Sequence, residues 1–276
     1  MSWRKKKKEI KKIKHKAGLI ICLMFAAVIG LIILLTIKII NSNNKLYKVE
    51  SRVETLKNVK PIENSNFKTI GWLKVEGTNI DLPIVYSDND NEDFPVQLES
   101  FGWAKKKFDK NSTYFDITGH NIFNLSSTPK IKSDMFKRFE ELMAFVYYDF
   151  AKDNEYIQLT VDNKDYIYKI FSVGFIDKSV ASFFPIKSDI EKDDINELIK
   201  VFKEKSLYKY DISVNANDKI ISLSTCTRFY GANSDTEFYV VGRLIRDDEK
   251  INHYKVIKNK KYEQVLKKLK GDENNE

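Results

Sequence analysis

The stretch Lys219-Ile-Ile-Ser-Leu-Ser-Thr-Cys-Thr227 alternates apolar residues with small polar ones. A period of two is typical of a β-strand, so the apolar residues share one face and Cys226 shares the other with the two serines. The strand runs out into a polar loop over 227–235, where the thiol can be semi-exposed on a rigid support, as a nucleophile requires. A free cysteine is also often an inert small apolar residue, and the strand alone leaves that alternative open.

Similar short runs, rich in β-branched and aromatic residues and separated by turn residues, fill the chain from about residue 69 onward. Ile157-Gln-Leu-Thr-Val161 alternates clearly, and Asp162-Asn-Lys-Asp165 after it predicts a hairpin turn. Seven or more short strands predict a mainly β fold, either a closed barrel or a sandwich. The expected strands are 69–75, 79–86, 112–118, 155–161, 166–176, 219–225 and 237–245.

Two helices are expected between these strands. The first carries Met135, Phe139, Leu142 and Met143 at helical spacing after the capping pair Ser133-Asp134. The second begins at Ser188-Asp-Ile-Glu191, which has the spacing of a capping box, and continues with an apolar stripe over 195–202.

The N-terminal region indicates a membrane anchor. Residues 1–16 contain nine Lys or Arg and one Glu, a local charge of +8, and the 38 basic and 38 acidic residues elsewhere make the body neutral. A neutral body argues against nucleic-acid binding, which needs a basic surface on the folded domain. Residues 17–37 carry no charge, and as a helix they would span about 31 Å, the thickness of a hydrocarbon core.

The alternative is a cleaved signal peptide, but the apolar run exceeds the usual length of about 7–15 residues and no good cleavage site follows. We therefore expect a basic cytoplasmic tail over 1–16, an uncleaved single-pass anchor over 17–40, and everything after it outside the cell membrane. A juxtamembrane amphipathic helix is expected over 41–65, packing its apolar stripe on the next domain or acting as a stalk. A catalytic domain over 66–250 and a polar, Lys-rich C-terminal tail over 251–276, with a frayed helix from His253 onward, complete the expected organisation.

Counting cysteines and histidines narrows the chemistry. Cys22 lies within the expected anchor, so Cys226 is the single thiol of the exterior domain. A lone thiol in an exported protein is an accident, an intermolecular bridge or a reactive nucleophile. With His15 in the cytoplasmic tail, His120 and His253 are the two candidate partners.

His120 follows the expected strand 112–118 and the turn residue Gly119, so it also stands at a strand end. A neighbouring imidazole is the usual means of activating a thiol that is mostly protonated at neutral pH. His120 could alternatively be a turn histidine bonded to the backbone. His253 belongs to a charged terminal segment and is expected to be solvated.

Four segments resemble the class B sortases, in the order of that family, and the resemblance extends over roughly residues 66–246. They are Gly71–Val85, Thr118-Gly-His-Asn121, Leu223-Ser-Thr-Cys-Thr227 and Val240–Ile245. The resemblance implies an eight-stranded sortase barrel with an N-terminal helix and a helix before the cysteine strand. It implies Cys226 as nucleophile, His120 as acid and base, and no cofactor or metal.

The implied reaction cleaves a C-terminal sorting signal, Asn-Pro-x-Thr-Asn-like in class B, after its Thr. The implied partners are secreted proteins bearing that signal and a peptidoglycan amine, which resolves the thioester. Two alternatives stay open: a pilin-polymerising sortase with a protein lysine as acceptor, and a sortase-like binding module of low activity. An L,D-transpeptidase is disfavoured because that family has Gly directly before its Cys, where this chain has Thr225.

One position departs from the family. The catalytic Arg of sortases precedes the last strand, and here that place holds Glu237. Arg243 shares the face of Glu237 but lies about 20 Å away along the strand, too far to substitute. Arg228, in the loop after Cys226, is the candidate replacement if it folds back, and otherwise a solvated loop residue. An oxyanion donor is worth about 3–4 kcal/mol, so its real absence would make the enzyme slow.

The acidic stretch Asp88-Asn-Asp-Asn-Glu-Asp93, with Glu99 at the twelfth position, loosely resembles a calcium-binding loop. It lacks the glycine needed at the sixth position and has strands rather than helices as neighbours. We therefore expect a solvated acidic loop and no metal site.

Overall fold

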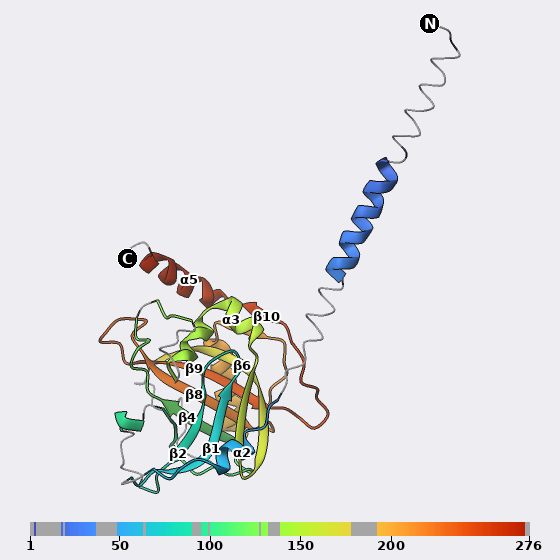
Figure 1. Cartoon of the computed structure of the whole chain (residues 1–276). Helices are drawn as coiled ribbons and strands as arrows, with labels where there is room; N and C mark the ends of the chain where they lie inside the picture. Colours follow the sequence, from blue (N-terminus) through green and yellow to red (C-terminus); the bar gives the residue numbers. More distant parts are fainter. Residues whose placement is uncertain are drawn as a thin grey trace. The chain divides into compact units, whose positions relative to one another are not determined.

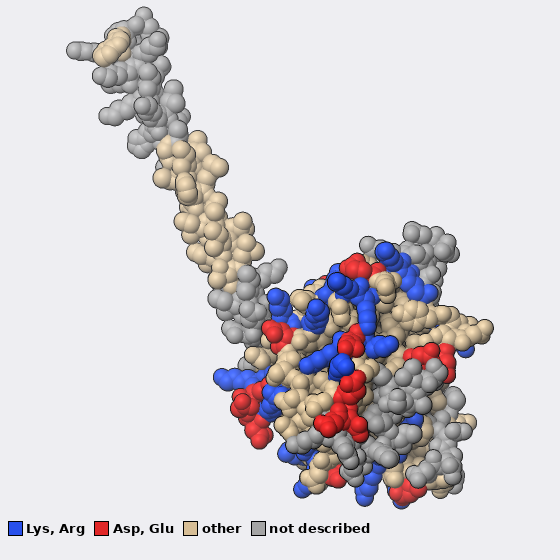
Figure 2. Space-filling view, turned by 180° about the vertical axis from the view of Figure 1, so that it is seen from behind, with Lys and Arg blue, Asp and Glu red and all other residues tan. Residues whose placement is uncertain are grey.

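The structure is a computed structural model of the chain. It describes residues 3, 18, 20–36, 49–62, 65–89, 95–98, 100–126, 128–131, 139–177 and 192–273. The chain divides into two compact units, Met1–Tyr47 and Lys48–Glu276. In the first unit residues 20–36 are helical and carry no charged side chain (Figures 1 and 2). No helix within the described ranges combines the length and apolarity needed to cross a membrane.

Within the described part of the second unit, eight strands form a closed barrel in the order β1-β2-β3-β4-β8-β9-β6-β5 (Figure 1). Neighbouring strands are antiparallel except for two parallel pairs, β2 with β3 and β4 with β8. The strands are β1 Lys68–Val75, β2 Asp81–Tyr86, β3 Gly102–Ala104, β4 Tyr114–Gly119, β5 Tyr156–Val161, β6 Lys164–Asp177, β8 Ile220–Thr227 and β9 Thr236–Leu244.

The predicted eight-stranded barrel is therefore confirmed. All seven expected strands are present, with ends within two residues of the expected ones. The sequence missed β3, whose three residues are too short to show a period, and a separate two-stranded sheet of β7 (Tyr208–Tyr210) and β10 (Val256–Lys258). Short strands escape sequence analysis because their pairing partners, not their own pattern, make them strands.

The interior of the barrel and its outer face are packed by different elements. The 3₁₀ helix η2 (Phe139–Val146) is buried along its whole length and belongs to the apolar core that fills the barrel. The α4 helix (Lys192–Lys205) covers part of the outer face, where its Ile195 and Phe202 pack with Tyr239 and Val241 of β9. Because α4 and the barrel enclose a second apolar cluster, the outer face of β8 and β9 is buried except near their ends.

The two expected interior helices have different outcomes. The second is present as α4, while its capping box over 188–191 lies outside the described residues. Of the first, the caps and Met135 lie outside the described residues, and Phe139 onward is a 3₁₀ helix, followed by α3 (Tyr148–Asp153). The apolar spacing predicted a buried helical segment there, and all residues of η2 are buried. It did not predict that this segment is a 3₁₀ helix rather than an α-helix.

The expected juxtamembrane helix is much shorter than 41–65. Residues 41–48 lie outside the described part, and α2 spans only Val53–Lys57, with no buried residue. An ion pair joins this segment to the barrel: Arg52 Nη2 lies 2.6 Å from Asp81 Oδ2, and Arg52 Nε donates to Oδ1 at 2.9 Å. Val49, Val53 and Leu56 of the expected apolar stripe are each half-buried, so the predicted packing of this stripe on the domain stays a prediction.

The segment 251–276, expected to be a polar tail, contributes β10 and the helix α5 (Lys260–Glu273) to the folded unit. In Figure 1 these elements lie beside α3. Four apolar residues of this segment are buried: Val256, Tyr262, Val265 and Leu269. Tyr262, Val265 and Leu269 have the spacing of an amphipathic helix, so the expected frayed helix is present as α5, while its packing and the strand β10 were not predicted.

His253 is not simply solvated, contrary to expectation. Its Nδ1 lies 2.7 Å from Oε2 of Glu155, a carboxylate whose side chain is fully buried. The backbone N–H of Tyr254 donates to Oε1 of the same carboxylate at 3.1 Å. Glu155, which directly precedes β5, therefore binds the segment that leads to β10 through His253 and Tyr254.

A pH dependence of stability follows from this buried carboxyl group. Burial raises the pKa of Glu155 from 4.5 to about 7, although the Tyr254 N–H opposes the shift. The folded protein therefore binds this proton more tightly than the unfolded chain, and stability falls as the pH rises between those two values. Glu155→Gln keeps the acceptor for Tyr254 and removes the titration. We expect a higher melting temperature than wild type near pH 8, and no gain near pH 5.

Thermal unfolding followed by circular dichroism across this pH range tests that expectation. Glu263→Gln, which removes an exposed carboxylate of α5, is the matched control. Parallel pH profiles for wild type and Glu155→Gln would contradict the assignment.

Candidate functional site

The register between β4 and β8 brings His120 and Cys226 to the same place. The two strands are parallel and Gly119 pairs with Thr225, so the next residues along them are His120 and Cys226. Neighbouring strands lie about 4.8 Å apart, which makes the two residues lateral neighbours at one end of the barrel. The side chains at alternate positions of both strands face the same side of the sheet, so imidazole and thiol share the outer face.

Cys226 stands out on its strand by exposure. Every other residue of β8 is buried, while Cys226 is exposed and His120 is half-buried. The thiol is therefore accessible to a substrate, and the buried strand around it holds it in place. This combination is expected of a nucleophile rather than of a cysteine packed in the core.

Hydrogen bonds tie the end of β4 to the end of β8. The buried Asn121 donates through Nδ2 to the backbone oxygen of Cys226 at 2.9 Å. Thr225 Oγ1 donates to the Gly119 oxygen at 2.7 Å, and Thr118 Oγ1 to the Ser224 oxygen at 3.1 Å. These bonds hold the backbone on both sides of His120 against the strand of the thiol.

Asn121 belongs to the Thr118-Gly-His-Asn121 motif, but the sequence alone indicates no role for it. The side chain of Asn121 also accepts from the backbone N–H of Asn124 at 2.9 Å. Asn124, almost fully buried, donates in turn to the backbone oxygens of Lys130 and Glu140, each at 3.1 Å. The loop after His120 is thus fastened to η2 as well as to β8, so Asn121 is a positioning residue.

Gly119 is required for packing rather than for a turn. It is the last residue of β4, and a Cβ there would stand 2.2 Å from Cγ of Phe139 in η2. Because the ring of Phe139 is fully buried in the core, it cannot move aside cheaply. The position before His120 is therefore set by contact with the barrel core.

Gly119→Ala should destabilise the protein by about 1–3 kcal/mol, the usual cost of overpacking a core. It should also slow the reaction of the thiol, because the displaced strand end carries His120. Urea unfolding measures the first effect and the alkylation rate of Cys226 the second. Gly102→Ala in β3 is the comparison, since its Cβ would meet its nearest neighbours at 3.0 and 3.1 Å and needs only a slight shift. Equal losses in the two variants would contradict this account.

Glu237 lies directly across from Cys226 in the antiparallel register of β8 and β9. Its side chain is half-buried. A carboxylate thus stands opposite the thiol on the neighbouring strand, at the position that the resemblance to sortases aligns with their arginine.

The other two arginines considered from the sequence lie apart from that position. Arg228 follows β8 in the loop and its side chain is exposed, so its folding back toward the thiol stays a prediction. Arg243 pairs with Ile220 at the opposite end of β9, is 1% exposed, and binds Glu249. This agrees with the exclusion of Arg243 as a substitute.

The charge of Glu237 acts across β8 on the next strand. Burial raises the pKa of Asp116 on β4 to about 6; the Ser222 hydroxyl opposes this shift and the charge of Glu237 adds to it. Burial also raises the pKa of Tyr114, again with a contribution from Asp116 and Glu237. The outer face behind the thiol is therefore acidic.

Exposed aromatic side chains flank the thiol and imidazole along the chain. Phe123, three residues after His120, is 52% exposed, and Tyr230, four residues after Cys226, is 51% exposed. The ring of Tyr230 packs against the rings of Phe175 and the buried Phe229, with 5.1 Å between ring centroids in each pair. Apolar surface next to a nucleophile and a base suits acyl transfer on an extended peptide.

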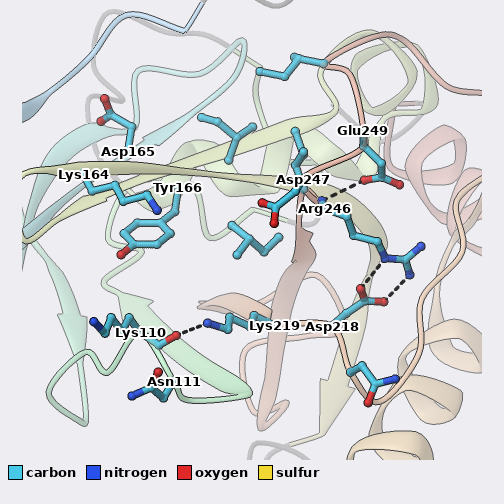
Figure 3. A pocket seen from close by; sticks show the side chains of 15 residues that line it. Lys110, Asn111, Lys164, Asp165, Tyr166, Asp218, Lys219, Arg246, Asp247 and Glu249 are labelled. Atoms are coloured by element: carbon cyan, nitrogen blue, oxygen red, sulfur yellow. Dashed lines mark hydrogen bonds and ion pairs between the residues drawn. The ribbon is translucent and has the colours of Figure 1, made fainter.

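A cavity of about 740 Å³ lies at the other end of the barrel, around the starts of β4, β6 and β8 and the end of β9 (Figure 3). Its charged side chains balance one another, and Arg246 forms an ion pair with Asp218 at 2.8 Å within it. Because this cavity lies at the opposite end of the strands from Cys226, it is not part of the site around the thiol. Of the acidic stretch considered for calcium, residues 90–94 and 99 lie outside the described residues, and Asp88 pairs with Lys68 at 2.7 Å.

Comparison with known proteins adds to this geometry. The family model described as the sortase domain matches residues 73–245. Sortase B of Staphylococcus aureus (strain NCTC 8325 / PS 47) is 24% identical over 194 residues, which cover 67% of this chain and 73% of that protein. Sortase B of Listeria monocytogenes serovar 1/2a is 25% identical over 197 residues, covering 68% and 71%. The X-ray structure of Clostridium perfringens sortase B superposes with a TM-score of 0.54 and 27% identity, covering 70% of this chain and 99% of that one.

These similarities span the barrel and all three strands that build the site, since residues 73–245 include β4, β8 and β9. The chain therefore belongs to the sortase family, in its class B, and is a sortase-type cysteine transpeptidase.

Proposed function

We propose that this protein cleaves a C-terminal sorting signal of the Asn-Pro-x-Thr-Asn type on secreted proteins and transfers them to a peptidoglycan amine. The observation that carries the proposal is the parallel pairing of β4 and β8, which sets His120 beside the exposed Cys226. The signal and the acceptor are inferred from the resemblance to class B sortases.

In this proposal the thiol of Cys226 gives its proton to His120, and the sulfur attacks the carbonyl carbon of the Thr in the signal. The peptide C–N bond breaks, the leaving amine takes the proton from His120, and a thioester remains on Cys226. An acceptor amine then forms the new amide bond and releases the thiol. Asn121 holds the backbone of Cys226 throughout, through its bond at 2.9 Å.

We further propose that residues 17–40 anchor the protein in the cell membrane as a single span, with the N-terminus cytoplasmic and the catalytic domain outside. The uncharged helix 20–36 and the nine basic residues before it support this. Digestion of intact protoplasts by an external protease should remove the domain while a tag at the N-terminus stays protected. Degradation of the tag in intact protoplasts would contradict this orientation.

Trapping of the acyl-enzyme tests the proposed reaction. The full-length protein in detergent is incubated with a panel of Thr-containing sorting peptides, and intact-mass spectrometry records adducts. We expect an adduct with the mass of the peptide up to its Thr, removed by hydroxylamine and absent in Cys226→Ala. If no peptide of the panel forms an adduct, or if Cys226→Ala behaves like wild type, the proposed function is wrong.

Glu237 opposite the thiol favours one second candidate, a sortase-like binding protein of low activity that holds sorting signals. A carboxylate opposite Cys226 cannot donate the hydrogen bond that stabilises an oxyanion. The alkylation rate of Cys226 separates the candidates: a rate no higher than that of free cysteine, and independent of His120, would indicate the binding protein. The acceptor in the product mass spectrum separates cell-wall transfer from pilin polymerisation.

A further inference from the structure

The loop that follows the nucleophile is anchored by one aromatic ring. Of residues 228–237, all of which the structure describes, Phe229 alone is buried, and its side chain is 0% exposed. The backbone N–H of Phe229 donates to Thr227 Oγ1 at 3.1 Å, which joins the start of the loop to the last residue of β8. Contacts that hold the ring of Phe229 therefore hold the loop, three residues after Cys226.

The ring of Phe229 is held both by the barrel and by the C-terminal helix. It stacks on Phe175 of β6 at 4.8 Å between ring centroids, with 19° between the ring planes. Lys268 Nζ of α5 lies 5.5 Å from the centroid of the Phe229 ring. An ammonium group within about 6 Å of an aromatic centroid is attracted by the ring. The buried Val265 and Leu269, one turn apart on α5, belong to the same apolar cluster as Phe229.

This contact comes from a part of the chain that the family model does not match. The sortase domain matches residues 73–245, and α5 begins at Lys260. Lys268 is half-buried, whereas its neighbour Lys267 is exposed. Partial burial strengthens a cation–π contact, because less water competes for the ammonium group. The C-terminal segment therefore contacts the anchor of the nucleophile's loop through one particular lysine.

We propose that α5 is a positioning element of the catalytic site: through Lys268 it holds Phe229, and with it the loop that begins directly after β8. The inference rests on the proposed function, since the site that α5 positions is the one that performs the proposed reaction. The exposed Tyr230 packs on Phe229 at 5.1 Å between ring centroids, so a shift of the buried ring moves aromatic surface four residues from Cys226. Groups around a nucleophile must be held within about 0.5 Å of their productive geometry.

Lys268→Met tests this role, because it removes the charge and keeps an unbranched side chain that can pack on the ring. The full-length protein in detergent is treated with an arginine-specific protease. Mass spectrometry records the initial rates of cleavage after Arg228, which is exposed in the loop, and after Arg243, which is buried in β9. Local opening of the loop exposes the first bond, whereas the second is cleaved through global unfolding.

We expect Lys268→Met to raise the ratio of cleavage after Arg228 to cleavage after Arg243 about 2- to 30-fold, the range that one cation–π contact supplies. Acylation of Cys226 by a sorting peptide should fall by a similar factor, because the loop is no longer held in place during the reaction. Lys268→Arg retains a cation and should restore both values toward those of wild type.

Two further variants make the test specific. Lys258→Met removes a cation that lies 4.8 Å from the ring centroid of Tyr148 and 5.0 Å from that of Tyr262, neither of which belongs to the loop, and should change neither value. Phe229→Leu keeps an apolar anchor without an aromatic face, so adding Lys268→Met to it should have no further effect. An unchanged cleavage ratio in Lys268→Met, an equal change in Lys258→Met, or additive effects in the double variant would overturn the assignment.

The protease separates this inference from the proposed function, because cleavage needs no sorting signal. If no sorting peptide acylates Cys226, the proposed function fails, and alkylation of Cys226 by iodoacetamide on a Cys22→Ser background replaces acylation as the second measurement. A lower alkylation rate in Lys268→Met then supports the role of α5, and an unchanged rate overturns it. If peptides acylate Lys268→Met as fast as wild type, the inference fails and the proposed function stands.

Discussion

Replacing His120 by glutamine should slow acylation of Cys226 by about 10²- to 10⁴-fold, the usual contribution of a positioned acid and base. The side chain stays polar and similar in size but can no longer carry the proton from the thiol to the leaving amine. The backbone around it should persist, because Asn121 and Thr225 hold the two strand ends together. The melting temperature should therefore change little while the rate falls.

Rapid-quench mass spectrometry with a sorting peptide measures that rate. The matched control is His253→Gln, which changes the other described histidine. His253 contacts Glu155 near the far end of the barrel, so its variant should keep the wild-type acylation rate. If the His120 variant acylates within a few-fold of wild type, imidazole is not the partner of the thiol.

Replacing Arg243 by methionine should destabilise the protein by about 3–5 kcal/mol, the cost of breaking a buried ion pair from one side. The guanidinium is 1% exposed and binds both carboxylate oxygens of Glu249. It also donates through Nε to the Ser213 oxygen at 3.0 Å. Loss of Arg243 leaves Glu249 with Lys169 at 3.7 Å as its remaining described ion-pair partner.

The dependence of the free energy of unfolding on acidic pH should change as well. The hydrogen bond from Arg243 holds the pKa of Glu249 down at about 2, so this pair stabilises wild type above the usual carboxyl range and the benefit is lost as the pH falls toward that value. Urea unfolding at neutral and acidic pH measures both effects. In Arg243→Met the neutral-pH stability should fall most.

Two variants make that test specific. Arg246→Met breaks the more exposed pair with Asp218 and should cost less than Arg243→Met, since Arg246 is 34% exposed. The double variant Arg243→Met with Glu249→Gln should recover part of the loss, because the charge of Glu249 no longer remains without its guanidinium, while the glutamine oxygen still offers Lys169 an acceptor. A loss below about 1 kcal/mol in Arg243→Met would contradict this role.

Most of the fold could be predicted because each barrel strand of ordinary length carries its own period of two. Gly102–Ala104 could not be predicted, because three residues show no period and become a strand only by pairing with β2 and β4. In the C-terminal segment the sequence predicts a frayed helix but not its packing. The high charge suggests a tail, whereas Tyr262, Val265 and Leu269 of α5 are buried in the main apolar cluster.

The candidate site was identified by residue counts together with the resemblance to the class B sortases, and not by geometry. With Cys22 in the apolar stretch, Cys226 is the single candidate thiol of the larger unit, and His120 the better placed of two histidines. The sequence also contained Asn121 and Glu237, but nothing local shows that the first binds the backbone of Cys226 or that the second lies across from the thiol.

The amino-acid sequence by itself determined the strands, the candidate nucleophile and its histidine, because periodicity and residue counts are local properties. Only the tertiary structure decided that His120 lies beside Cys226 and Glu237 opposite it, with Arg243 at the far end. The hydrogen bond from Thr225 to Gly119, which links β8 to β4, joins residues that are 106 positions apart in the sequence. The register of such distant strands depends on packing, here of Phe139 against Gly119, which no local pattern contains.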